Sequence, residues 1–332
     1  MTNHKNILKF TQLWFVSAVI IVLSGSIVSA ETPTNPCVQQ STNKDMKNII
    51  DELFVERIKR LVSAKVLPKN FIERVEGVPY FICSDRNFEA AVLPNGVVKF
   101  DDSLINAISS QSGALLLGQY LHLDFSDVPI TALYEELLTF ALMQNLYPNM
   151  KTETVGTLIS KISNGRGKIK KYITHVKFNE RFGTLFLHGL GFMVLHEQCH
   201  VALQHNKTAQ RDKVNQEYQA DLCAIEIVSK HEEVTGGSPG AAFLGAMTMV
   251  STQMVFDQLF TGLLGEKKFL ENRLHPSPAD RLEKLSIVVK SELMRRKISD
   301  PRFYDTIDGM YVLMKNLKER FENLHKYHHF LK

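Results

Sequence analysis

Three polar residues, His196, Glu197 and His200, stand together in an otherwise apolar stretch. Residues 192–203 contain no Pro or Gly, which predicts a buried helix. Residues four apart share a helix face, so the two His can offer imidazole nitrogens to one metal ion. Glu197 lies about 100° further round, where its carboxylate can act as general base on a water at that metal. A buried helix that carries two His by chance is the alternative, but unpartnered buried polar groups are costly.

The next helical stretch, residues 214–228, offers a third ligand, because a catalytic zinc ion (Zn2+) usually has three protein ligands and a water. Glu217 and Asp221 are four apart there and share a helix face. The connection between the two stretches, residues 206–213, is short and polar, which predicts antiparallel neighbouring helices. We therefore predict Glu217 as the third ligand and Asp221 as the carboxylate that orients a ligand His.

A solvated pair on an exposed helix is the alternative for these two carboxylates. Against it, the stretch carries small residues that would let it approach its partner closely, and large apolar residues that predict at least half burial. The small residues are Ala220 and Ala224, and the large apolar ones are Leu222, Ile225 and Val228.

The order His-Glu-x-x-His followed by Glu-x-x-x-Asp resembles the gluzincin metallopeptidases. Residues 87–100 and 274–282 resemble the strand upstream of the zinc helix and the His-Pro-to-Arg segment downstream of it in the family of the bacterial heat-shock protease HtpX and the CAAX prenyl endopeptidases. This resemblance implies a zincin-like domain whose edge strand pairs with extended substrate. Residues 90–100 are the candidate for that strand, with an ordinary structural hairpin as the alternative.

His275 belongs to the downstream segment, where Pro276 and Pro278 predict a rigid loop. Three roles stay open for it. It could hydrogen-bond a neighbouring helix, it could occupy the fourth zinc position and keep the enzyme latent, or it could donate to an oxyanion during turnover. Latency is the functional role we favour, because an exported protease without a visible propeptide domain needs some restraint.

The first 30 residues have the pattern of a cleaved signal peptide. Lys5 and Lys9 precede an apolar run from 13 to 28, and Val28-Ser29-Ala30 is a small-residue cleavage site. Cleavage near Ala30 would place the protein in the periplasm or outside the cell, whereas an uncleaved segment would anchor it to a membrane. The whole chain has a formal charge of +4, which is too small to indicate a nucleic-acid partner.

After a loose leader at 31–45, residues 46–332 are predicted to form one catalytic domain. Its class is α+β, predominantly helical, with the two metal-binding helices, a small edge-strand sheet and a helical insert at about 104–180. A basic run in the insert is a solvated loop or a contact with a membrane surface. Strands are expected at 78–83 and 90–100, and helices at 46–66, 130–146, 241–264, 278–296 and 301–326.

The four cysteines fall into two groups. Cys37 and Cys83 lie outside the metal helices and could pair in an oxidising compartment. Cys199 and Cys223 lie on the two metal helices, where they are expected to be small buried hydrophobes rather than ligands, although a disulfide between them is possible. Sequence does not fix the pairing.

These patterns predict an exported zinc endopeptidase that acts on protein or peptide substrates, with envelope proteins, including misfolded ones, implied by the resemblance. Two alternatives remain. One is a chaperone or binding module that keeps zinc without proteolysis, which an intact Glu197 argues against. The other is a membrane-anchored scaffold that uses the apolar segments 13–28 and 241–264. The sequence gives no oligomeric state.

Overall fold

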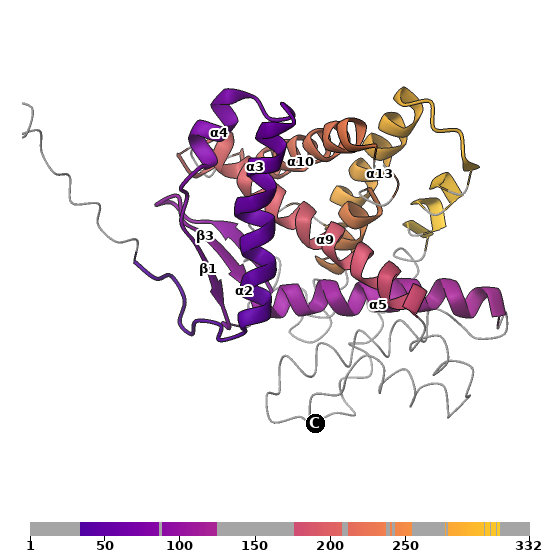
Figure 1. Ribbon diagram of the computed structural model, residues 1–332, viewed down its shortest axis with the longest axis horizontal. Coiled ribbons are helices and arrows are strands. Elements are labelled where there is room, and N and C mark those ends of the chain that lie inside the picture. Colours follow the sequence, from indigo (N-terminus) through magenta and orange to yellow (C-terminus); the bar gives the residue numbers. More distant parts are fainter. Residues whose placement is uncertain are drawn as a thin grey trace, which may run out of the picture. The chain divides into compact units, whose positions relative to one another are not determined.

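Helices dominate the chain, and a small sheet accompanies them, as predicted (Figure 1). The computed structural model describes residues 34–85, 88–124, 176–207, 212–236, 240, 243–253, 276, 278–301, 303–305, 307–309 and 311–312. Residues 36–332 form one unit, separate from residues 1–35. Several predicted features lie outside the described residues: the signal peptide, the basic run and the helix at 130–146 in the insert, His275, and the distal parts of the segments 241–264 and 301–326.

The predicted helix at 46–66 is a continuous helical stretch with a π-helical turn in its middle. It consists of α2 (Lys44–Asp51), η1 (Glu52–Glu56) and α3 (Arg57–Ser63), and α4 (Lys69–Val75) follows. Asn43 caps its start by accepting a hydrogen bond from the Met46 N–H at 3.0 Å. At the π turn, the Phe54 carbonyl accepts a 2.9 Å hydrogen bond from Gln198 Nε2. This bond attaches the stretch to the residue that follows Glu197.

Three short strands form the sheet in the order β1-β3-β2. β1 (Tyr80–Cys83) is parallel to β3 (Val98–Asp101), and β2 (Ala90–Val92) is antiparallel to it. The segment 90–100 is therefore a hairpin of two strands. Its turn contains Gly96 at φ +83°, a left-handed conformation that favours glycine.

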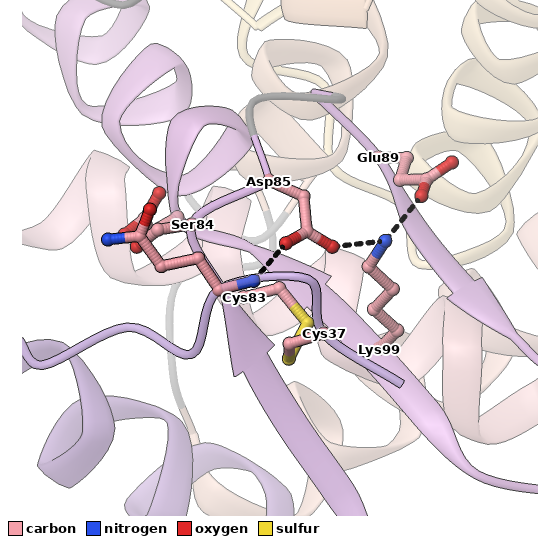
Figure 2. The surroundings of a disulfide bond; sticks show 8 residues. Cys37, Cys83, Ser84, Asp85, Glu89 and Lys99 are labelled. Carbon is pink, nitrogen blue, oxygen red and sulfur yellow. Dashed lines mark hydrogen bonds and ion pairs between the residues drawn. A yellow bond between two sulfur atoms is a disulfide. The ribbon is translucent and has the colours of Figure 1, made fainter. Parts of the chain in front are cut away.

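The outer edge of β1 is covered by the segment that precedes α2 (Figure 2). A Cys37–Cys83 disulfide ties this segment to β1, and Gln40 pairs with Cys83 in an antiparallel bridge. Beside the disulfide, the buried Lys99 ammonium lies 2.9 Å from carboxylate oxygens of both Asp85 and Glu89. Although burial opposes the charge, these two carboxylates raise the pKa of Lys99. The other edge of the sheet is β2, and no described segment forms backbone pairs with its outer side.

Long helices pack behind the sheet. α5 (Asp102–Asp124) follows β3 directly and lies along α9 (Val176–Ala202), with Leu104, Ile105 and Ile108 almost fully buried. The first residues of the expected insert therefore belong to the domain core. The remaining helices are α10 (Lys213–Thr235), α13 (Pro278–Arg295) and a helical segment at 243–253. Among the described residues, no helix combines the length and the apolar composition that crossing a bilayer requires.

Candidate metal centre

The two helices that carry the predicted ligands lie side by side, as their short connection predicts. His196 lies opposite Asp221 and His200 opposite Glu217, so α9 and α10 run antiparallel at this point. Ala220 and Ala224 are fully buried, as expected for small residues at a close helix contact. The stretch buries one face, including Ile225 and Val228, but Leu222 is 49% exposed. It lies two positions from each of these alanines, about 200° round the helix, and so faces away from α9.

The three predicted ligands converge. His196 Nε2 and His200 Nε2 are 3.0 Å apart. The two oxygens of Glu217 lie 3.2 Å from His196 Nε2 and 3.3 Å from His200 Nε2. All three residues are buried and offer ligand atoms within 4.8 Å of one another. Zinc–ligand distances of 2.0–2.1 Å in tetrahedral geometry separate neighbouring ligand atoms by about 3.3 Å, so this group could hold a metal ion without rearrangement.

Glu197 lies beside this group without joining it. Its Oε1 is 4.0 Å from His196 Nε2, and its side chain is 4% exposed. Glu197 is therefore farther from the imidazole nitrogens than Glu217 is, and only Glu217 is placed as a ligand. A carboxylate at this distance can reach a water molecule on a metal ion held by the other three residues, as the spacing in the sequence predicts.

Behind His196, a chain of buried charged groups holds the ring. His196 Nδ1 lies 2.9 Å from Asp221 Oδ1, at ion-pair distance but not aligned as a hydrogen bond. Arg281 donates to both Asp221 oxygens, from Nε at 3.0 Å and Nη2 at 2.7 Å, and from Nη1 to Gln253 Oε1 at 2.8 Å. A bidentate guanidinium–carboxylate pair fixes orientation as well as charge. Asp221 therefore lies between Arg281 and the His196 ring, and its role in orienting that ring stays a prediction.

The pKa values of these buried groups follow from burial and neighbouring charges together. Burial alone would raise the pKa of the Asp221 carboxyl, but the charges of Arg281 and His196 hold it below its ordinary value. Burial likewise opposes a charged His196, yet Asp221 and Glu217 raise its pKa to about 10. Burial lowers the pKa of His200, which therefore remains neutral, the form of imidazole that binds metals.

A second chain of contacts stands behind His200. His205 Nδ1 lies 2.8 Å from His200 Nδ1, and His205 Nε2 lies 3.0 Å from Gln219 Oε1. With Nε2 of His200 reserved for a metal, its Nδ1–H donates to His205 Nδ1, and the Nε2–H of His205 donates to Gln219. α9 ends at Ala202, and Gln204 at φ +60° turns the chain so that His205 folds back onto His200. Each ligand His thus has its own supporting group.

The sequence did not reveal these supporting groups fully. No pattern in the sequence indicates that His205, Gln219 or Gln253 supports a metal ligand. Arg281 contacts a carboxylate 60 positions away in the chain. In the sequence, Arg281 is marked only as the Arg of the 274–282 segment. That segment by itself does not indicate which residue Arg281 contacts.

A disulfide between Cys199 and Cys223 joins α9 to α10 beside the ligands. The expectation that neither cysteine is a ligand agrees with this pairing, because both sulfurs are used by the bond. Together with Cys37–Cys83, it leaves no free cysteine. The structure thus answers the question of pairing that the sequence leaves open.

Residues 163–294 match the family described as Peptidase U49. The matched stretch contains both metal helices, the Cys199–Cys223 disulfide and Arg281. The match supports a peptidase. No curated protein and no solved structure matches the chain. The finer resemblance to gluzincins of the HtpX and CAAX endopeptidase family remains a prediction.

Proposed function

We propose that the protein is an exported zinc-dependent endopeptidase that hydrolyses peptide bonds of envelope proteins. One observation carries this proposal. The buried group His196, His200 and Glu217, with Glu197 beside it, lies inside the stretch that matches a peptidase family. Two imidazoles and one carboxylate are a donor set that suits zinc in a catalytic site, because the fourth position stays open for water or substrate.

Zinc held there would lower the pKa of a bound water towards about 7 and polarise the substrate carbonyl. Glu197 accepts the proton of the attacking water and delivers it to the leaving nitrogen. Asp221, fixed by Arg281, keeps the His196 ring in place, and His205 does the same for His200. The ligands and the base are all largely buried, so this proton transfer takes place in surroundings of low dielectric.

The position of the hairpin supports a place for an extended substrate. The turn of the hairpin lies against the segment after α9, because a Cβ added at Gly96 would lie 3.6 Å from Asn206 Nδ2. β2, whose outer edge no described segment pairs with, contacts α9. An extended peptide could add to this edge through main-chain hydrogen bonds, which would bring its carbonyls toward the metal group.

Export is supported by the disulfides together with the first 30 residues. Disulfides persist in oxidising compartments and are rare in the cytosol, and all four cysteines of this chain are paired. A signal peptide would deliver the chain to such a compartment, the periplasm or the exterior. Envelope proteins would be its substrates there.

The deciding experiment compares the wild type, Glu197→Gln and a matched control, Glu226→Gln, on denatured envelope extract. Glu226 lies on the exposed side of α10, where it pairs with Lys230. We expect Glu197→Gln to bind about one zinc per chain yet to lose proteolysis, because an amide cannot accept the proton of water. Glu226→Gln should behave as the wild type. Zinc binding with no proteolysis in the wild type would instead favour a zinc-containing chaperone or binding module.

A further inference from the structure

The disulfide at the metal site encloses most of that site within one loop. Cys199 directly precedes His200, and Cys223 follows Asp221 by two residues. The bond links positions 24 apart, and that loop contains two of the three ligands, His200 and Glu217. It also contains the supporting residues His205, Gln219 and Asp221. Cys199 thus lies within one turn of helix from His196 and His200, and Cys223 lies six residues along α10 from Glu217.

Convergence of these ligands depends on how α9 is placed along α10. His196 and His200 come from one helix and Glu217 from the other, and the three ligand atoms must stay within 4.8 Å. A slip by one residue moves a helix by about 1.5 Å and turns its side chains by about 100°. Such a slip would remove Glu217 from both imidazoles. Ala220 and Ala224 on α10 are fully buried and small, so their side chains allow close approach of a neighbouring helix but offer little bulk to resist a slip.

The two cysteine residues differ in exposure. Cys199 is fully buried, whereas Cys223 is only partly buried. A reductant would therefore attack the sulfur of Cys223 first. A water-soluble phosphine would break the S–S bond and convert both cysteines to thiols. The phosphorus would take an oxygen atom from water and become a phosphine oxide. Two electrons pass from phosphorus to the disulfide.

We propose that the Cys199–Cys223 disulfide is a positioning cross-link of the metal site, so that the protein holds zinc tightly only in its oxidised form. The inference rests on the proposed function for the identity of the metal. It adds that the redox state of the compartment sets the fraction of chains that carry zinc. A disulfide that only stabilised the fold would have no selective effect on the metal.

The second disulfide of the chain is a matched control. Cys37–Cys83 closes a longer loop, 46 positions against 24, but ties the segment before α2 to β1 and involves no metal ligand (Figure 2). We compare the full chain, its Cys199→Ala/Cys223→Ala variant and its Cys37→Ala/Cys83→Ala variant. Zinc affinity is measured by competition with a chelating dye, and far-ultraviolet circular dichroism measures the folded fraction.

Relative to the wild type, we expect zinc affinity to fall roughly tenfold to hundredfold in Cys199→Ala/Cys223→Ala, as for loss of groups that orient metal ligands. In Cys37→Ala/Cys83→Ala it should stay within about twofold. Should the first variant fail to fold, the second still tests the proposal, since it retains only the disulfide at the site. Treating it with the phosphine should release zinc while the helical signal persists.

Zinc affinity that is equal with and without the Cys199–Cys223 bond, at equal folded fraction, would overturn the proposal and leave the proposed function intact. An equal loss in both variants would also overturn it, because the disulfides would then act only through general stability. A wild type that binds no zinc in its oxidised form would remove the proposed function, and the cross-link proposal with it.

Discussion

Arg281 and Arg295 lie on the same helix and carry the same charge, yet their surroundings differ completely. The Arg281 side chain is 3% exposed and donates to Asp221 and Gln253. The Arg295 side chain is 53% exposed and pairs with Glu233 and Glu292 at the surface. A buried charge that loses its partner is costly, whereas surface ion pairs contribute little. This contrast makes the two arginines a direct test of the support behind His196.

We predict that Arg281→Met destabilises the protein by about 3–5 kcal/mol, because the buried Asp221 carboxylate loses its bidentate guanidinium partner and keeps only the His196 ring. The variant should also bind zinc roughly tenfold more weakly or worse, since His196 loses its orientation. Arg295→Met should change neither quantity appreciably. Urea unfolding and dye competition for zinc measure the two effects, and equal behaviour of the two variants would contradict the assignment.

The support behind His200 gives a separate prediction. Replacing His205 by Phe keeps a ring of similar size but removes the acceptor that faces the Nδ1 of His200. We expect zinc affinity to fall roughly tenfold to hundredfold. The control is His231→Phe, which lies far along α10 from the ligands. A His205→Phe variant with wild-type zinc affinity would show that this contact does not hold the ligand.

At the scale of the elements, the helical segment 243–253 crosses α9 where two glycines meet. A Cβ added at Gly245 would lie 2.4 Å from the Cβ of His188 and 2.5 Å from its backbone carbon. One added at Gly189 would lie 3.4 Å from the Gly245 carbonyl oxygen. The helices can approach this closely because Gly245 has no side chain. The segment also carries Gln253, so the crossing supports the Arg281 side of the metal site.

Gly245→Ala should therefore destabilise the protein by about 1–3 kcal/mol, as overpacking of a core does. Gly183 on α9 is the matched control, because a Cβ there would meet nothing within 4 Å. Gly183→Ala should stabilise by about 0.5–1 kcal/mol, since alanine loses less conformational entropy than glycine in a helix. Thermal or urea unfolding decides the matter. Effects of the same sign would contradict this account of the crossing.

At this scale the sequence could predict features that lie within a single helix. The spacing of His196 and His200, and of Glu217 and Asp221, is a property of one helix each, and periodicity reveals it. The contact between Arg281 and Asp221, the return of His205 to His200 and the pairing of Cys199 with Cys223 are properties of packing between segments. No pattern within one segment contains them. The exposed position of Leu222 is a property of the same kind, because the face that α10 buries is decided by its neighbours.

At the scale of the whole molecule, the helices bring a second group of charges together away from the metal site. Arg57 on α3 interacts with His188 on α9 and with His231 and Glu232 on α10. Burial lowers the pKa of Arg57 to about 10, although Glu232 opposes this shift. Burial, followed by the charges of Arg57 and His231, lowers the pKa of His188 to about 4. His188 is therefore neutral in the folded protein at neutral pH.

This depressed pKa makes stability depend on pH with a definite sign. An unfolded His titrates at about 6.5, so between pH 6.5 and 4 the unfolded chain binds a proton at His188 that the folded chain does not. Stability therefore falls as the pH drops through this range. A tenfold difference in proton affinity corresponds to about 1.4 kcal/mol. Allowing for the partial exposure of the ring, we expect His188 to account for a loss of about 2 kcal/mol between pH 7 and 4.5.

Carboxylates and the metal ligands also titrate over this range, so the prediction concerns a difference between two proteins. His188→Gln removes this titration while keeping a polar side chain of similar length. Free energies of unfolding in urea, measured on metal-free protein at pH 7 and 4.5, should fall about 2 kcal/mol further in the wild type than in the variant. Parallel losses in the two proteins would mean that His188 titrates alike in the folded and unfolded chains. The junction of α3, α9 and α10 would then not exclude the proton.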